Sequence, residues 1–324
     1  MNIVFMGTPD FAKESLQALV ESGHNIQLVI TNPDKPKGRG MKFQYTPVKE
    51  YALEAGLEIE QPLKIRNNEE IVNKIKEKNP DLICVVAYGK IIPNEILEIP
   101  TKGAINVHGS LLPQYRGAAP IQWAVLNGDK KTGITTMYIS DKMDEGDMIL
   151  KEETEIGEDE NVGEVWNRLS KIGAKLLVKT LEQIEAGTVK RIPQTSEGLE
   201  APTYAPMLDK AMAQIDWENK SAKEIKNLVR GLNPIMGAYT VINNKKFKFW
   251  KVQVLENQNF LEEFDYNKEK LNSKKNGEVI LADAKKGLFL KANDGIILVL
   301  EIQAENAKKM NILDFLRGNG FDIK

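Results

Sequence analysis

The chain has 324 residues, of which 42% are hydrophobic and 28% are charged, and its formal net charge is −2. This composition is typical of a soluble globular protein, and the length favours two domains. The single cysteine, Cys84, excludes an internal disulfide framework and indicates a reducing compartment. Because Cys84 lies within the apolar run LICVVAY, we expect it to pack as a small buried residue.

We expect neither a signal peptide at the start of this sequence nor a membrane-spanning segment within it. The opening MNIVFMGTPDF has no basic region, and its apolar run is too short for a signal peptide. No window approaches the ~18 apolar residues of a membrane span. We therefore expect a cytoplasmic protein that has no membrane partner.

The first 190 residues alternate between apolar strands and amphipathic helices. This alternation predicts βαβ units and a Rossmann-like, mostly parallel sheet that is buried on both faces. The first loop contains one glycine rather than the pattern G-x-G-x-x-G, which disfavours dinucleotide binding. The predicted strands span 2–6, 26–30, 81–89 and 103–109, and the predicted helices span 10–22, 50–56, 69–79, 118–127 and 161–186.

The segment 31–49, TNPDKPKGRGMKFQYTPVK, is long for a connection between a strand and a helix. It lies where a parallel sheet binds ligands, at the carboxyl end of a strand. A flexible basic loop there could bind phosphates and become ordered on binding, whereas a solvated insertion is the alternative. Its five basic residues, set against the single acid Asp34, are Lys35, Lys37, Arg39, Lys42 and Lys49.

Asn106 and His108 lie two residues apart in the strand AINVH, so their side chains are expected on the same face of the sheet. An amide and an imidazole placed together can stabilise an oxyanion and move a proton. A hydrogen-bonded core histidine is the alternative. One carboxylate of the later segment SDKMDEGDM could orient His108, and the spacing of its acids does not match an EF-hand calcium loop.

Residues 188–206 contain three prolines and little periodicity, which predicts an inter-domain linker or an extended crossing segment. After one helix near 221–232, short strands separated by Gly, Lys and Asn turns predict a small antiparallel β-barrel or sandwich. The charged run 268–276 is predicted to be a solvated hairpin tip. Residues 206–324 carry 20 Lys and Arg against 16 Asp and Glu, a mildly basic balance compatible with an anionic partner.

The strings INVHGSLLPQYRGAAP, MDEGDM and VFMGTPDFA closely resemble the folate-dependent formyltransferase family, and within it the methionyl-tRNA formyltransferases. The resemblance runs essentially from end to end, from GTPDF through GRG, VVAYGKIIP and the block around His108 to IDW and the smaller C-terminal domain. It implies a formyltransferase domain at 1–188, a linker at 189–206 and an OB-like β-barrel domain that binds tRNA at 207–324. It also implies formyl transfer from 10-formyltetrahydrofolate to the α-amino group of initiator methionyl-tRNA, without a metal, by an enzyme expected to be a monomer.

The resemblance further implies the site residues. Asn106, His108 and Asp144 match the catalytic asparagine, histidine and aspartate of the family. The residues that match the folate-binding segments are Ser110, Leu111, Leu112 and Pro113, together with Tyr88, Gly89 and Ile91. The residues that match the insertion that contacts tRNA are Lys35, Lys37, Arg39 and Lys42.

Two alternatives remain open from the sequence. The first is a folate-dependent formyltransferase acting on a small amine, such as glycinamide ribonucleotide or an amino sugar nucleotide. The long basic loop and the appended domain disfavour it, because both suggest a macromolecular substrate. The second is a non-catalytic RNA-binding protein that retains this fold, which the intact Asn106, His108 and Asp144 disfavour.

Overall fold

The computed structural model describes residues 1–37 and 42–318. The chain divides into two compact units, each of which takes residues from three stretches of the sequence. The first unit comprises 1–121, 131–155 and 166–206, and the second comprises 122–130, 156–165 and 207–324.

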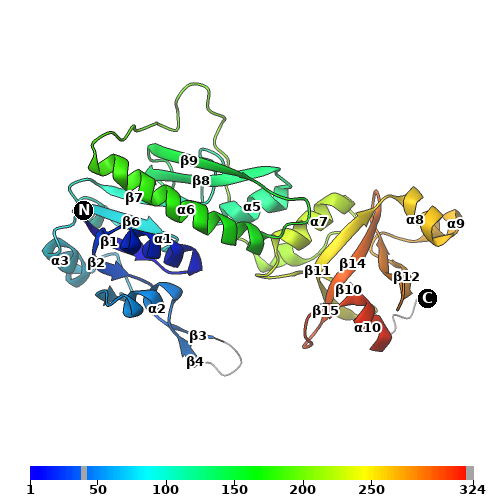
Figure 1. Cartoon of the computed structure of the whole chain (residues 1–324). Coiled ribbons are helices and arrows are strands. Elements are labelled where there is room, and N and C mark those ends of the chain that lie inside the picture. The colour runs from blue at the N-terminus through cyan, green and yellow to red at the C-terminus, as the bar shows by residue number, and fades with distance from the viewer. Residues whose placement is uncertain (38–41, 319–324) are drawn as a thin grey trace. The chain divides into compact units, whose positions relative to one another are not determined.

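A seven-stranded sheet in the order β5-β2-β1-β6-β7-β8-β9 forms the centre of the first unit (Figure 1). The strands from β5 to β7 are parallel, and β8 and β9 continue the sheet in antiparallel pairing. The predicted Rossmann-like, mostly parallel sheet is therefore confirmed. Its strands are β1 (Asn2–Gly7), β2 (Asn25–Ile30), β5 (Ile59–Glu60), β6 (Leu82–Val86), β7 (Ala104–His108), β8 (Lys131–Tyr138) and β9 (Met148–Glu155).

Helices cover both faces of this sheet. On one face α1 and α6 meet through Phe11 and Trp166, whose ring centroids are 5.1 Å apart. On the other face α3 and α4 bury Ile75 and Ile96 against strand residues such as Ile83. The helices are α1 (Asp10–Glu21), α2 (Pro47–Glu54), α3 (Glu69–Glu77), α4 (Asn94–Leu97), α5 (Pro120–Asn127) and α6 (Val162–Glu185). Among the described residues, no helix combines the length and the apolar character needed to cross a bilayer.

The predicted loop at 31–49 is more ordered than expected. Its described parts form a two-stranded hairpin, β3 (Lys35–Lys37) and β4 (Lys42–Gln44), and its end forms the start of α2. The Thr46 side chain caps α2 by accepting from the Lys49 N–H, and Pro47 occupies the first turn, where its missing N–H costs nothing. The segment expected to be a flexible basic loop therefore contains a short hairpin and the first turn of a helix.

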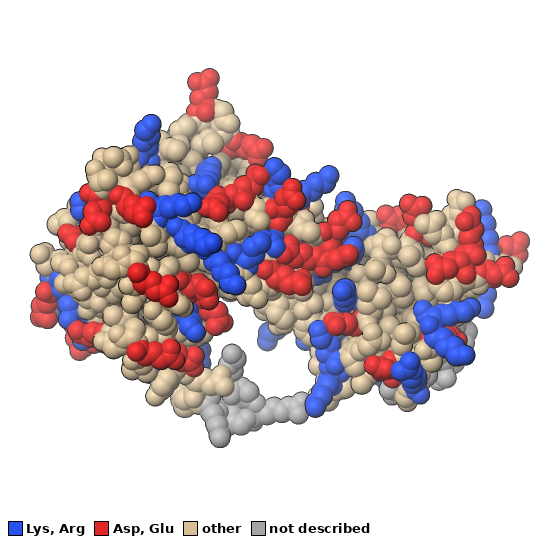
Figure 2. Space-filling view, in the orientation of Figure 1, with Lys and Arg blue, Asp and Glu red and all other residues tan. Residues whose placement is uncertain are grey.

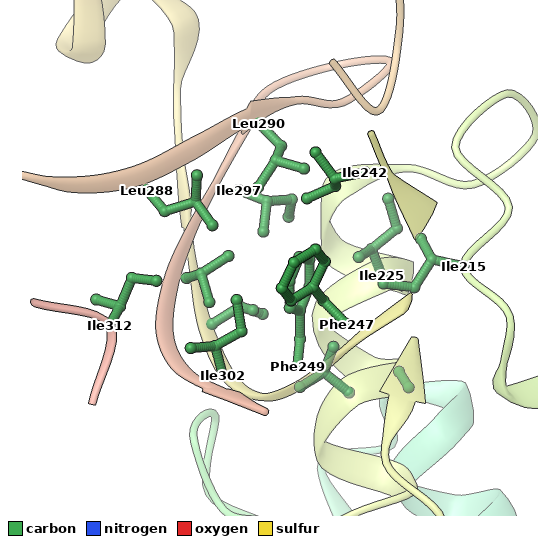
Figure 3. Close-up of a cluster of buried hydrophobic side chains, with 14 of the residues drawn as sticks. Ile215, Ile225, Ile242, Phe247, Phe249, Leu288, Leu290, Ile297, Ile302 and Ile312 are labelled. Carbon is green, nitrogen blue, oxygen red and sulfur yellow. The ribbon is translucent and has the colours of Figure 1, made fainter. Parts of the chain in front are cut away.

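The second unit contains an antiparallel sheet in the order β10-β11-β14-β13-β12, with β15 paired to β14. Alternate strand residues, including Phe249, Leu290 and Ile297, point into an apolar core that α7 and α10 also line (Figure 3). The strands are β10 (Ala238–Ile242), β11 (Lys245–Leu255), β12 (Val279–Asp283), β13 (Gly287–Lys291), β14 (Ile296–Ala304) and β15 (Met310–Asn311). The helices are a 3-10 turn (Lys210–Ala213), α7 (Ala222–Gly231), α8 (Asn257–Phe264), α9 (Lys268–Ser273) and α10 (Ile312–Gly318).

The prediction for 268–276 was wrong. Residues Lys268–Ser273 form α9, which the Asn267 side chain caps by accepting from the Lys270 N–H. Leu271 is buried in a small cluster with Phe260 and Phe289. One apolar residue among charges was too weak a periodic signal to indicate a helix.

We expect Phe249→Ala to lower the free energy of unfolding of the second unit by about 3–5 kcal/mol, because the side chain is fully buried in the apolar core and its removal leaves a cavity. Chemical denaturation followed by tryptophan fluorescence measures the change. Val241→Ala is the matched control, since Val241 lies on the neighbouring strand β10 with 56% of its surface exposed. Equal losses in the two variants would contradict the assignment of this core.

Candidate active site

Strand β7 places two of the predicted site residues on one face of the first sheet. Val107 faces α6, because a Cβ atom on Gly173 of that helix would lie 3.1 Å from its side chain. Asn106 and His108, its neighbours in the strand, therefore face the opposite side. β7 is held between β6 and β8, and His108 is 5% exposed.

Both ring nitrogens of His108 face oxygen atoms. Nε2 lies 2.9 Å from the carbonyl oxygen of Tyr115, and Nδ1 lies 3.7 Å from Oδ1 of Asp144. The backbone carbonyl can only accept a hydrogen bond, so Nε2 carries a proton in this arrangement. When Nδ1 is protonated as well, it presents an N–H to the Asp144 carboxylate, which can then orient the ring and stabilise the positive charge on it.

Asp144 reaches His108 from a loop that doubles back along the sheet. After β8 the Ile139 N–H donates to the carbonyl of Ala104 at 2.8 Å, at the start of β7. Ala104 lies four residues before His108, roughly 13 Å along an extended strand. The segment that follows Ile139 must return over this distance, and Oδ2 of Asp144 then accepts from the Gly117 N–H at 2.8 Å.

Close backbone approach and side-chain hydrogen bonds hold the returning loop. The Tyr138 N–H donates to the Asp147 carbonyl at 2.9 Å, which brings Gly146 against the end of β8. A Cβ atom on Gly146 would lie 1.8 Å from the Tyr138 carbonyl oxygen, so only glycine fits there. The Gln194 amide donates to the carbonyls of Asp144 and Gly146 at 2.7 and 3.0 Å.

The segment predicted to be a linker, 189–206, is bound to the first unit at its end. Thr203 accepts from the Arg116 N–H through its carbonyl and from the Tyr115 N–H through its hydroxyl, both at 2.8 Å. The Ala205 N–H donates to the Arg116 carbonyl at 2.7 Å. These bonds fix the loop that carries Gly117 and the Tyr115 carbonyl, the partners of Asp144 and His108.

The predicted folate contacts follow two neighbouring parallel strands, β6 and β7, so they meet at one edge of the sheet. Gly89 and Ile91 are exposed, and Leu111 is half-buried. Tyr88 is 2% exposed, and its hydroxyl has no hydrogen-bond partner among the described residues. Burial raises the pKa of the Tyr88 phenol to about 12, so it is a neutral donor. Ser110, Leu112 and Pro113 are buried, and the Lys151 ammonium donates to the Leu112 carbonyl, so this segment is held from within the protein.

The predicted tRNA contacts follow β2, which ends at the same edge of the sheet and is separated from β7 by β1 and β6. Lys35 is exposed on β3. Lys37 and Lys42 are opposite each other in the backbone register of β3 and β4. Arg39 lies outside the described residues. Lys49 instead forms an ion pair with Asp34 at 2.5 Å, at the base of the hairpin.

Cys84 packs as predicted. It is fully buried in β6, and burial raises the pKa of its thiol, which disfavours the reactive thiolate. Among the residues that the structure describes, no group of three or more His, Cys, Asp and Glu side chains has the geometry of a metal site.

The chain belongs to the formyl transferase family. Residues 1–181 match the family described as formyl transferase, and residues 207–320 match formyl transferase, C-terminal domain. The family predicted from the motifs around Asn106 and Asp144 is therefore confirmed, and with it one-carbon formyl transfer as the class of reaction.

Three similar proteins are informative. Methionyl-tRNA formyltransferase of Ruminiclostridium cellulolyticum is 45% identical over 322 residues, which cover 99% of this chain and 98% of the relative. An N-formyltransferase from Helicobacter canadensis, solved with folinic acid and dTDP-3-aminofucose, has a TM-score of 0.63 at 16% identity, with 95% and 99% coverage. HypX from Aquifex aeolicus in complex with tetrahydrofolic acid has a TM-score of 0.60 at 17% identity; the match covers 97% of this chain and 46% of HypX.

Sequence reasoning missed the residues that hold the candidate site together. Arg116 and Gln194 are both polar and more than nine-tenths buried, and Thr135 is fully buried. Thr135 accepts from the Leu112 N–H and donates to the Ser110 carbonyl, which fixes the loop after β7. The charge of Arg116 within the otherwise uncharged string RGAAP was the one local sign of a special role. Gln194 gave no such sign, because it lies in an aperiodic segment 78 residues from its partner Arg116.

We expect Gly146→Ala to reduce kcat by on the order of 10²-fold, because the added methyl group must displace the loop that carries Asp144. Steady-state formyl transfer measures the effect. Gly318→Ala is the matched control, since a Cβ atom at that helical glycine meets nothing within 4 Å. Full activity of Gly146→Ala would show that the loop tolerates displacement.

Proposed function

We propose that this chain is a methionyl-tRNA formyltransferase. It transfers the formyl group of 10-formyltetrahydrofolate to the α-amino group of initiator methionyl-tRNA, giving N-formylmethionyl-tRNA for translation initiation. The observation that carries the proposal is the 45% identity to a methionyl-tRNA formyltransferase over nearly the whole of both chains. The structure adds His108 and Asp144 in contact distance at one end of the sheet. We also propose that the enzyme acts in the cytoplasm and as a monomer.

Asn106 and His108 would stabilise the charge that develops during transfer. When an amine adds to a formyl carbon, the formyl oxygen becomes negatively charged. On the same face of β7, the Asn106 amide can donate to that oxygen, and the His108 Nε2–H can donate to it once the oxygen takes the place of the Tyr115 carbonyl. A well-placed donor of this kind contributes about 3–4 kcal/mol to the stability of the transition state.

Asp144 and His108 would also manage the proton of the attacking amine. An α-amino group has a reference pKa of about 8, so a useful fraction is unprotonated near neutral pH. The amine loses a second proton as the amide forms. The Asp144 carboxylate is 15% exposed beside the imidazole, and it can accept that proton directly or through the ring. The bond between the formyl carbon and N10 breaks as the tetrahedral adduct collapses, and the same proton passed to N10 releases tetrahydrofolate and balances the step.

The residues at the edge of β6 and β7 fit a folate, which supplies the formyl group on its N10 atom. The buried Tyr88 hydroxyl lacks a partner among the described residues, and a polar ring substituent could supply one. Exposed Ile91 and half-buried Leu111 offer apolar surface to a flat ring. The solved relative from Helicobacter canadensis was crystallised with folinic acid, which supports this class of ligand.

The hairpin β3–β4 would bind the acceptor end of the tRNA. Lys35, Lys37 and Lys42 belong to its strands, Arg39 lies between them in the sequence, and positive charge of this density attracts phosphates. On the face that Figure 2 shows, the second unit carries both signs of charge, with Lys and Arg more frequent along its lower side. Residues 206–324 carry 20 Lys and Arg against 16 Asp and Glu, so their net positive charge is small for their number. The second unit would add contact surface rather than most of the charge.

The acceptor specificity tests the proposal directly. Purified protein is supplied with 10-formyltetrahydrofolate and, in parallel, with initiator methionyl-tRNA, glycinamide ribonucleotide, an amino sugar nucleotide or free methionine. We expect rapid transfer to the tRNA alone. Transfer to a small acceptor would retain the reaction and overturn the substrate, and no transfer to any of them by the folded protein would overturn the proposal.

We expect His108→Ala to bind folate as the wild type does and to lose kcat by on the order of 10²–10³-fold, because an oxyanion donor is removed without altering the folate contacts. Equilibrium binding of a folate analogue and single-turnover transfer separate the two effects. His24→Ala is the control. His24, the other histidine of the chain, directly precedes β2, which β1 and β6 separate from β7 in the sheet. Retained turnover in His108→Ala would contradict the role given to His108.

A further inference from the structure

A chain of buried hydrogen bonds connects Arg116 to the backbone of the loop that carries Asp144. The Arg116 Nε donates to Gln194 Oε1 at 2.9 Å, and Gln194 Nε2 donates to the carbonyls of Asp144 and Gly146. Arg116 and Gln194 are 7% and 6% exposed. All of these residues belong to the first unit.

The chemistry of the partners fixes the orientation of the Gln194 amide. A guanidinium only donates and a carbonyl only accepts, so Oε1 must face Arg116 and Nε2 must face the two carbonyls. Both N–H groups of the amide are then used. Arg116 Nη1 also lies 3.3 Å from Glu145 Oε1, so three successive residues of the loop, 144–146, are held from one side.

Asp144 needs such support because its backbone is in an uncommon conformation. Its φ is 53°, in the left-handed region that residues other than glycine rarely adopt. Such a conformation costs free energy and persists only where the surroundings impose it. The bond from Gln194 to the Asp144 carbonyl acts on that same residue, whose carboxylate contacts His108 and Gly117.

We propose that Gln194 is a positioning residue for Asp144, acting through its amide N–H groups rather than through contact with either substrate. The inference rests on the proposed function, in which Asp144 orients His108 and receives the proton of the amine. Loss of the two N–H donors lets the loop relax and moves the carboxylate away from the imidazole. Gln194 itself touches the backbone of the loop and Arg116.

Two substitutions separate positioning from a structural role. Gln194→Glu retains the length of the side chain and the oxygen that accepts from Arg116, and it removes the N–H donors to the loop. Gln194→Ala removes both sets of bonds. We expect both variants to lose kcat by on the order of 10²-fold with KM unchanged for folate and for methionyl-tRNA. Full activity of Gln194→Glu would overturn the proposal, since it would leave the bond to Arg116 as the essential one.

A double-mutant cycle with Asp144→Asn tests whether Gln194 acts through Asp144. If it does, adding Gln194→Glu to Asp144→Asn lowers kcat little further. Independent losses that multiply would contradict the proposal. Ser196→Ala is the control on the same segment, because the Ser196 hydroxyl bonds only to the local Pro193 carbonyl at 2.7 Å among its described contacts.

The two histidines of the chain provide a readout that does not depend on the acceptor. In a histidine-selective NMR spectrum of the full chain, His24→Ala assigns the two sets of imidazole resonances. We expect Gln194→Glu and Gln194→Ala to shift the His108 resonances in the direction of Asp144→Asn and to leave those of His24 in place. Unmoved His108 resonances would overturn the positioning role. Unmoved His24 resonances show that each variant is folded.

The NMR and kinetic results distinguish failure of this inference from failure of the proposed function. A wild-type protein that transfers no formyl group to methionyl-tRNA overturns the function, while the His108 resonances still test whether Gln194 positions Asp144. An active wild type with unaltered Gln194 variants overturns the inference alone.

Discussion

The candidate site depends on one constraint, the return of the β8–β9 connection along the sheet to bring Asp144 beside His108. Antiparallel pairing of β8 with β7 carries the chain away from His108, so a tight hairpin would leave every carboxylate of this segment at the wrong end. Glycine at 146 permits the close approach to β8, and Asp144 lies in a left-handed conformation with its carboxylate beside His108. The Gly117 N–H then donates to the Asp144 carboxylate, and the Gln194 amide donates to the backbone carbonyl of the same residue.

Much of the fold could be predicted because its signals are local. The apolar run that contains Cys84 and the strand that contains His108 indicated buried parallel strands, and β6 and β7 lie where these patterns placed them. The predicted strand 81–89 ends at Val86, since Ala87 takes a φ of 46° and leaves the sheet. The helices α1, α3 and α6 were predicted within about two residues at their ends because each presents a clear apolar face.

The arrangement around the site could not be predicted because it rests on contacts between distant segments. The pairing of Thr203 with Arg116 joins residues 87 positions apart and gives neither segment a periodic pattern. The prolines and the lack of periodicity in 189–206 predicted a linker. The bonds that hold its end are formed by backbone groups, which every residue type carries, so the sequence does not reveal them. The motifs indicated Asn106, His108 and Asp144 as a set, and their chemical roles remain predictions that the proposed variants test.

The burial of Cys84 has a practical consequence for following this enzyme at work. The only thiol of the chain lies inside β6 with none of its surface exposed, so maleimide reagents should leave the folded native protein unlabelled. A cysteine introduced at an exposed site would then carry a fluorophore or spin label alone, without prior removal of native cysteines. Phe43 on the hairpin, 73% exposed, is such a site, and a probe there would report when the hairpin meets an RNA.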